Sequence, residues 1–394
     1  MILKLKTEND FSTDLFDPQK KAMTLGHGSQ SDLRFAFGGN AGRTMEKFFL
    51  EDALGAKLSL KFRLYYRLRP LIPIWLRQRM QKTRGEGMND VSNNWFMPIE
   101  FVEEFEAALR EDLKEKPDSQ IIHPWPDGHQ MCVSLTHDVE TADGVKRVDE
   151  LAKLEEAHGF RSCWYFIPHK YPIDIGLIRD LKQRGHEIGV HGYNHDGRLF
   201  SKKRIFEKRR GLMVKAFEDL GADGFRAPMV HRNLDWIKTL DTKHDGSCFD
   251  IDPYQAMAGG VGSFWPFFKG DMVELPYSLP QDHTLFVALA KNDIDIWKRK
   301  IAFLNRWRGM ALLVTHPDYL NTVERLEHYQ SFLEHLKTLE SPWFALPNEI
   351  ADWWKERDQS QIVSAESGEP EINGPARGRG RILALSDLLQ RKTA

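Results

Sequence analysis

Two histidines four residues apart, His191 and His195, lie in the segment EIGVHGYNH and could bind one divalent metal ion. Residues 187–190 predict a short apolar strand, and Gly192 with the polar residues after it predicts a loop. Both imidazoles would then lie where a strand ends, a common place for chemistry in α/β proteins. The chain has 15 histidines in 394 residues, so the spacing needs further support.

A second segment, SLTHDVE at residues 134–140, provides carboxylates at the end of another apolar run. Residues two apart on a strand share a face, so Asp138 and Glu140 would point the same way and Val139 would point away. Two imidazoles and a carboxylate form a frequent ligand set for catalytic zinc and leave one position open for water. Cobalt, nickel and iron also suit such ligands.

The composition is that of an ordinary globular protein, with 41% hydrophobic and 28% charged residues. A net charge of −2 provides no general attraction to nucleic acid. We expect a cytoplasmic protein, because the first residues lack an apolar signal-peptide core and no apolar run of about 18 residues occurs. The dispersed cysteines Cys132, Cys163 and Cys248 indicate buried thiols rather than disulfides or a thiolate metal site.

From about residue 125 the sequence alternates strand-like and helix-like segments, which predicts successive βα units. About seven expected strands have helices between most of them. This count favours an α/β fold with a closed or partly closed barrel, over residues 121–357, rather than a sandwich.

The flanking regions differ from the barrel. Residues 1–120 predict a helical N-terminal extension, in which residues 57–84 carry nine basic residues and no acidic ones. This segment is either a helical arm lying on the barrel or a docking surface for anionic lipid headgroups. Residues 358–394 predict a flexible tail, because 358–380 are poor in apolar residues; a short amphipathic stretch follows at 381–391.

Taken in order, five segments resemble those of polysaccharide deacetylases of the NodB-homology type, carbohydrate esterase family four. SLTHDVE is similar to the family's Thr-Phe-Asp-Asp-Gly, and HGYNH to His-Ser/Thr-x-x-His, with Gly192 in place of the hydroxyl residue. FRAP resembles Arg-x-Pro, FDIDPY with VELPY takes the fourth place, and LVTHPDY resembles Leu-x-His. The resemblance covers about residues 125–355. It implies a distorted (β/α)7-type barrel and metal-dependent removal of an acyl group from a sugar.

The resemblance also implies roles for individual residues. Asp138 would be the base that takes a proton from water, His316 the acid that protonates the leaving nitrogen, and Arg226 the residue that orients the base. A nearby guanidinium also keeps a carboxylate ionised. Asp250 or Asp252 could likewise hold His316 as imidazolium. The candidate substrate-binding residues are His137, His231, Asp250 and Asp252.

The main departure from the family pattern is Val139, which stands at the position of a metal-binding aspartate. Valine cannot bind an ion, so Glu140 is the candidate third ligand beside His191 and His195. An alternative places Asp138 on the metal and makes Glu140 the base. Loss of activity is a third possibility.

We therefore expect a metal-dependent deacetylase, with zinc as cofactor, that hydrolyses an N-acetyl or O-acetyl group on a sugar. Its expected pathway is the biosynthesis of surface polysaccharide or lipopolysaccharide. The substrate would be an acetylated sugar, a nucleotide sugar or a lipid-linked glycan, with peripheral contact to an anionic membrane through residues 57–84. The alternative, motivated by Val139 and the basic segment, is a catalytically silent glycan-binding or scaffold protein.

Overall fold

The computed structural model describes residues 32–55, 60–68, 72, 73, 76, 79, 80, 83, 93–365 and 367–390. The contacts group Leu33–Ala394 into one compact unit. The predictions for residues 1–31 lie outside the described residues, and the basic segment 57–84 is described only in part.

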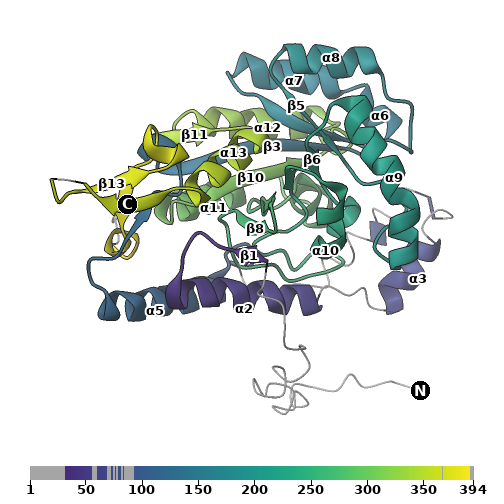
Figure 1. Cartoon of the computed structure of the whole chain (residues 1–394). Coiled ribbons are helices and arrows are strands. Elements are labelled where there is room, and N and C mark those ends of the chain that lie inside the picture. The colour runs from purple at the N-terminus through teal and green to yellow at the C-terminus, as the bar shows by residue number, and fades with distance from the viewer. Residues whose placement is uncertain are drawn as a thin grey trace. The chain divides into compact units, whose positions relative to one another are not determined.

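A curled, mainly parallel sheet lies at the centre of this unit (Figure 1). Its strands are β1 (Leu33–Arg34), β3 (Met131–Val139), β4 (Ser162–Phe166), β5 (Glu187–Val190), β6 (Gly224–Phe225), β7 (His244–Asp245), β8 (Phe267–Lys269), β9 (Met272–Glu274), β10 (Met310–Thr315) and β11 (Pro342–Phe344). The order is β1-β8-β9-β7-β6-β5-β4-β3-β10, and β11 also pairs with β3. From β10 to β9 all neighbouring strands run parallel. Strand β8 pairs antiparallel with β9, and β1 pairs antiparallel with β8.

The segment after β9 brings the two ends of the parallel run together. The backbone N–H groups of Ser278 and Leu279 donate to the carbonyl oxygen of Leu312 in β10, each at 3.2 Å. The hydroxyl of Ser278 donates to the Met310 carbonyl oxygen at 2.5 Å. The sheet therefore curls into the distorted α/β barrel that the sequence predicts.

The residues of β3 explain why this strand lies in the middle of the barrel. All nine residues, MCVSLTHDV, are buried, which is typical of parallel strands covered on both faces. Its register pairs it with β10 from Cys132 and with β4 as far as Val139. The three cysteines are free and buried, as expected.

Helices in the segments between the strands cover the sheet (Figure 1). They are α6 (Ala142–Val145), α7 (Val148–Ala157), α8 (Ile175–Gln183), α9 (Lys203–Leu220), α10 (Leu234–Ile237), α11 (Asp295–Arg306), α12 (Val323–Leu336) and α13 (Pro347–Asp358). Side-chain oxygens cap several of them, including Asp174 at α8 and Thr322 at α12. No helix in the described part of the chain is both long and apolar enough to cross a bilayer.

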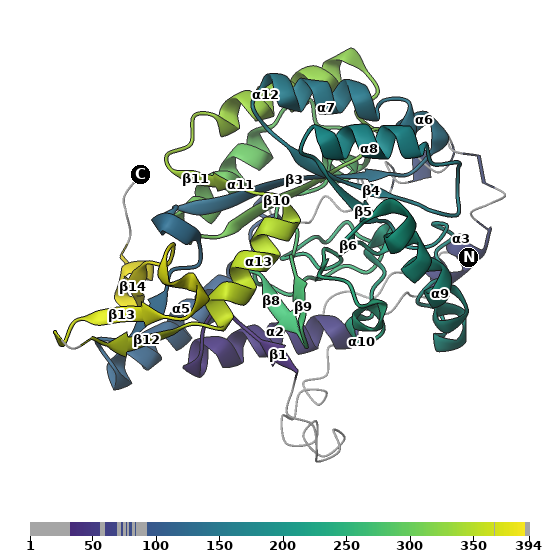
Figure 2. The same cartoon turned by 45° about the horizontal axis from the view of Figure 1, so that its top comes forward.

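The described residues before β2 (Gln120–Ile122) pack into the barrel core. Helices α2 (Gly39–Gly55) and α5 (Ile99–Glu115) lie side by side in Figures 1 and 2. The ring of Phe37 lies 5.1 Å from that of Phe105 and 4.9 Å from that of Trp265. Strand β1 meanwhile extends the edge of the barrel sheet. These residues share one core with the barrel.

The predicted disorder of residues 358–380 is wrong. Strand β12 (Gln361–Ser364) pairs with β13 (Pro370–Asn373), and β14 (Ile382–Ala384) pairs with β2 (Gln120–Ile122). Ile372, Leu383 and Leu388 are buried. Composition alone underestimates how ordered this segment is. Strand pairing satisfies its backbone hydrogen bonds, and a few apolar side chains suffice to pack it against the rest of the protein.

A buried ion pair joins α2 to the barrel. The Asp52 carboxylate accepts hydrogen bonds from Arg232 at 2.6 and 2.5 Å, and their side chains are 5% and 4% exposed. Asp52 also accepts from the backbone N–H of Gly260 at 3.1 Å, and the Arg232 guanidinium lies over the Phe249 ring. Neither charge can lose its partner without remaining buried and unpaired.

We predict that Asp52→Ala lowers the free energy of unfolding by about 3–5 kcal/mol, the usual cost of leaving one buried charge unpaired. Urea denaturation measures the change. Glu104→Ala is the control, because it removes the exposed Lys47–Glu104 pair between α2 and α5 and should cost less than about 1 kcal/mol. Equal effects of the two substitutions would contradict the buried-pair argument.

Candidate metal centre

The residues singled out by the sequence meet at one edge of the sheet. Asp138 lies at the carboxyl end of β3, His191 and His195 follow β5, Arg226 follows β6, and His316 follows β10. Parallel strands direct their carboxyl ends to the same edge, so loops far apart in the sequence bring these side chains together. His191 Nε2 and His316 Nε2 lie 3.7 and 4.0 Å from Asp138 Oδ2.

Glu140, His191 and His195 form a cluster suited to a metal ion, with one ligand atom from each residue within 4.8 Å of the others. His195 Nε2 lies 2.8 Å from Glu140 Oε1. His191 Nδ1 contacts the Arg226 carbonyl oxygen at 3.1 Å, which favours the tautomer with its proton on Nδ1. His191 Nε2 is buried without a hydrogen-bond partner among the described residues, so its lone pair is available to an ion.

The protonation states of His191 and Glu140 also suit metal binding. Burial lowers the pKa of His191 to about 4, so the imidazole is neutral near pH 7. Burial alone would raise the pKa of Glu140, but the neighbouring His195 and His316 hold it well below its ordinary value. A neutral imidazole and an ionised carboxylate are the forms that bind divalent metals.

Asp138 is held by a fully buried arginine. Arg226 Nη1 donates to Asp138 Oδ1 and to the Thr136 hydroxyl, both at 3.0 Å, and Arg226 Nε donates to the Gly246 carbonyl oxygen. Burial alone would raise the pKa of Asp138, but His191 and Arg226 lower it. Asp138 is therefore an oriented carboxylate with one oxygen, Oδ2, turned toward the histidines.

His316 is paired with a carboxylate that the sequence analysis missed, Asp282. His316 Nδ1 lies 2.7 Å from Asp282 Oδ1, and the His316 backbone N–H donates to Asp282 Oδ2 at 2.8 Å. Burial alone would lower the pKa of His316, but Asp282, with Glu140 and Asp138 nearby, raises it to about 10. In the sequence, the only indication was that Asp282 follows VELPY. In the structure, Asp282 lies directly before the π-helical turn η6 (His283–Ala288).

The expected roles of Asp250 and Asp252 at His316 are therefore corrected. Asp250 forms a buried salt bridge with Lys300. Asp252 accepts from the Tyr254 backbone N–H and from Gln255 Nε2, each at 2.9 Å. Both carboxylates serve local structure in the described part of the chain, because their oxygens are used by neighbouring donors.

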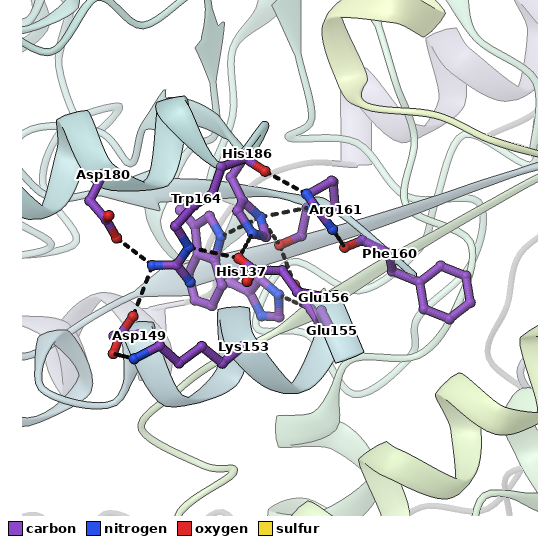
Figure 3. Close-up of polar contacts among 12 residues, drawn as sticks. His137, Asp149, Lys153, Glu155, Glu156, Phe160, Arg161, Trp164, Asp180 and His186 are labelled. Atoms are coloured by element: carbon purple, nitrogen blue, oxygen red, sulfur yellow. Dashed lines mark hydrogen bonds and ion pairs between the residues drawn. The ribbon is translucent and has the colours of Figure 1, made fainter. Parts of the chain in front are cut away.

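His137 is also corrected, since it lies on the opposite face of β3 from the metal cluster. Its ring stacks on Trp164 at 3.9 Å, and one ring nitrogen contacts Glu155 Oε1 at 2.6 Å (Figure 3). The other ring nitrogen contacts the Thr315 hydroxyl at 2.7 Å. The side chain is completely buried. Strand alternation turns His137 outward toward α7, so it cannot contact a substrate at the site.

A hollow lies beside His195. It is lined by Tyr193, Asn194, His195, Asp196, Gly197, Leu199, Phe200, Pro228 and His231. The backbone of Gly192 has a φ of +62°, and an added Cβ would lie 2.4 Å from Pro228. Only glycine fits at position 192, because Pro228 packs directly against this turn. This explains why Gly192 stands where the deacetylase motif has serine or threonine. Of the predicted substrate-binding residues, only His231 lines this hollow.

We predict that Asp282→Asn lowers the pKa of His316 in the metal-free protein, because an amide cannot stabilise the imidazolium as a carboxylate does. Proton NMR titration of the imidazole signals measures the change. The folded-state pKa lies above the unfolded value of about 6.5, so stabilisation from this pair is complete below about pH 6.5 and is lost toward pH 10. Asp252→Asn is the control; an unchanged His316 pKa in Asp282→Asn would contradict the pairing.

Known proteins similar in sequence to this chain include one that is named as a deacetylase. No protein-family model matches the chain. The sequence is 22% identical over 247 residues to a protein named peptidoglycan deacetylase from Helicobacter pylori, covering 54% of this chain and 84% of that protein.

Solved structures assigned as polysaccharide deacetylases also align with the chain. One is from Mycobacterium smegmatis, with 19% identity, a TM-score of 0.47, and coverage of 59% of this chain and 93% of that chain. Another is from Pseudomonas aeruginosa PAO1, with 16% identity, a TM-score of 0.46, and coverage of 59% and 94%. The chain is thus similar to proteins named as deacetylases, and it has Asp138-Val139-Glu140 in its first segment.

Proposed function

We propose that this protein is a metal-dependent deacetylase that hydrolyses an N-acetyl or O-acetyl group on a sugar. The observation that carries the proposal is the cluster of Glu140, His191 and His195 beside the ion-paired carboxylate of Asp138. The similarity to a protein named peptidoglycan deacetylase supports the same class of substrate. Zinc is the proposed ion, and cobalt, nickel or iron would suit the same ligands.

Each residue has a separate task in this proposal. A divalent ion on Glu140, His191 and His195 would lower the pKa of a bound water and polarise the acyl carbonyl. Asp138 then takes the proton of the attacking water through Oδ2, since Oδ1 is held by Arg226. For an N-acetyl group, His316 protonates the departing nitrogen, and its pairing with Asp282 keeps it charged for that step.

The geometry favours Glu140 over Asp138 as the third ligand. Glu140 offers a carboxylate oxygen that lies within 4.8 Å of ligand atoms of both His191 and His195, and these three residues form the candidate metal group of the described chain. One Asp138 oxygen is already committed to Arg226. Glu140 therefore takes the place of the missing ligand at Val139, because its side chain points to the same side of the chain as that of Asp138.

The hollow beside His195 is the proposed sugar site. Tyr193 and Phe200 offer aromatic surface for a sugar ring, and His231 offers a polar contact. The proposed substrates are acetylated sugars of surface polysaccharide or lipopolysaccharide synthesis, free, nucleotide-linked or lipid-linked, handled in the cytoplasm. A silent glycan-binding protein is the second candidate, because Val139 removes the family's metal-binding aspartate.

We also propose that the basic segment 57–84 contacts anionic membranes. Helix α3 (Leu60–Leu68) exposes Leu64 at 58% and Leu68 at 44%, and Lys61 is exposed on the same side of the helix. Exposed leucines beside basic residues suit the boundary between lipid headgroups and acyl chains. Such contact would place a lipid-linked substrate near the barrel.

We predict that the purified protein binds about one divalent ion, and that His191→Ala and His195→Ala each lose it. Metal analysis after dialysis measures the ion, and acetate release from acetylated sugars, with and without chelator, measures activity. Asp138→Asn should retain the ion but lose about 10²–10⁴-fold in rate, the usual contribution of a general base.

His335→Ala is the matched control for these substitutions, because it changes a half-buried histidine on α12 outside the cluster. Acetate release that persists in chelator would contradict the enzyme proposal. A protein with neither a stoichiometric ion nor any acetate release would favour the silent glycan-binding candidate, because that candidate lacks the family's metal-binding aspartate at Val139.

For the membrane proposal, we predict salt-sensitive flotation with vesicles that contain phosphatidylserine. Changing Arg63, Arg67 and Arg69 together to Gln should weaken binding about 100-fold, since each basic residue near the surface contributes about 1 kcal/mol. Changing Lys202, Lys203 and Arg204 to Gln is the control, because these exposed residues begin α9 elsewhere on the chain. Equal weakening by the two triple substitutions would refute a specific role for residues 57–84.

A further inference from the structure

The peptide group that joins Val139 to Glu140 is held by two side chains rather than by the sheet. Strand β3 is in register with β4 as far as the pair Val139–Phe166, so Glu140 is the first residue beyond it. On one edge of the peptide, the Tyr171 hydroxyl donates to the Val139 carbonyl oxygen. On the other edge, the Glu140 N–H donates to Asp318 Oδ2 at 3.1 Å.

Each of these two side chains is fixed by further contacts. Tyr171 is buried, and its hydroxyl oxygen accepts from the Ile167 backbone N–H at 3.0 Å. The second oxygen of Asp318 accepts from the Thr141 hydroxyl. An added Cβ at Gly144 would lie 2.5 Å from Asp318 Oδ2, so a glycine is needed there to leave room for the carboxylate.

Asp318 also joins the two halves of the site. It lies two residues after His316, in a turn closed by a hydrogen bond from the Tyr319 N–H to the His316 carbonyl oxygen at 2.9 Å. The turn that carries the candidate acid is therefore tied to the residue that carries the candidate ligand. A shift of either loop would move both Glu140 and His316.

We propose that Asp318, assisted by Tyr171, is a positioning residue that directs the Glu140 carboxylate toward His191 and His195. A glutamate side chain has several rotatable bonds, and the direction in which it leaves the backbone decides whether it reaches the cluster. Because Glu140 lies past the last strand pair, the two side chains replace the hydrogen bonds that a sheet would supply. This inference rests on the proposed role of Glu140 as a metal ligand.

The test compares cobalt and zinc affinity, measured by competition with a coloured chelator, among the wild type and three variants. Asp318→Ala should bind about 10–100-fold more weakly, the usual effect of losing a group that orients a ligand. Asp318→Asn should recover part of the affinity, because its amide oxygen can still accept from Glu140 N–H. Tyr171→Phe tests the other edge of the peptide and keeps the ring.

Two further measurements separate positioning from a general loss of structure. Amide hydrogen exchange at Glu140 should accelerate in Asp318→Ala, and the visible spectrum of bound cobalt should change. Asp143→Ala is the control, because it removes a nearby side-chain carboxylate that is 88% exposed and pairs only with Lys146 among the contacts described. Its affinity and cobalt spectrum should match the wild type.

The outcomes distinguish this inference from the proposed function. If the wild type binds no stoichiometric ion, the metal-dependent function fails and the inference fails with it. If the wild type binds an ion and Asp318→Ala and Tyr171→Phe both bind it equally well, the inference alone is overturned. Equal losses in Asp318→Ala and Asp143→Ala would also overturn it. If Asp318→Ala does not fold, Asp318→Asn and Tyr171→Phe decide the matter.

Discussion

The buried charge pair between Arg226 and Asp138 is the interaction on which the arrangement of the site depends. Arg226 is fully buried, and Asp138 is nearly so, so each charge requires the other to remain in the barrel interior. The same guanidinium donates to the Thr136 hydroxyl and to the Gly246 carbonyl oxygen. The Arg226 side chain therefore links β3 to the segment after β7, and the Arg226 backbone directly follows β6.

Arg226 also affects the packing and orientation of uncharged residues nearby. The Arg226 guanidinium lies 4.3 Å from the centre of the Tyr165 ring, and that ring covers Gly189 in β5. A Cβ at Gly189 would lie 2.3 Å from the ring, which explains the glycine in EIGV. The backbone carbonyl of Arg226 meanwhile orients His191 through Nδ1. One residue thus orients the candidate base with its side chain and a candidate ligand with its backbone.

Much of the site could be predicted because it depends on strand periodicity and on the common edge of parallel strands. Those two rules bring Asp138, Glu140 and the histidines after β5 to one edge of the sheet, whereas the choice of Glu140 as the ligand also used the resemblance to the deacetylases. The partner of His316 could not be predicted, because Asp282 lies in an irregular segment whose path is set by tertiary packing. The ordered segment after residue 358 was missed for a similar reason, since its pairing with β2 joins residues more than 250 positions apart.

The outer face of β3 contributes to the site although none of its side chains reaches it. His137 is fixed by Glu155 and by the Thr315 hydroxyl of β10, and Glu155 in turn accepts from the hydroxyls of Ser162 and Tyr329. These contacts bind β3 to β4, β10, α7 and α12 on one face, while Arg226 holds it on the other. A strand fixed from both faces cannot rotate or slip, and the carboxylates at its end keep the geometry that metal binding and proton transfer require.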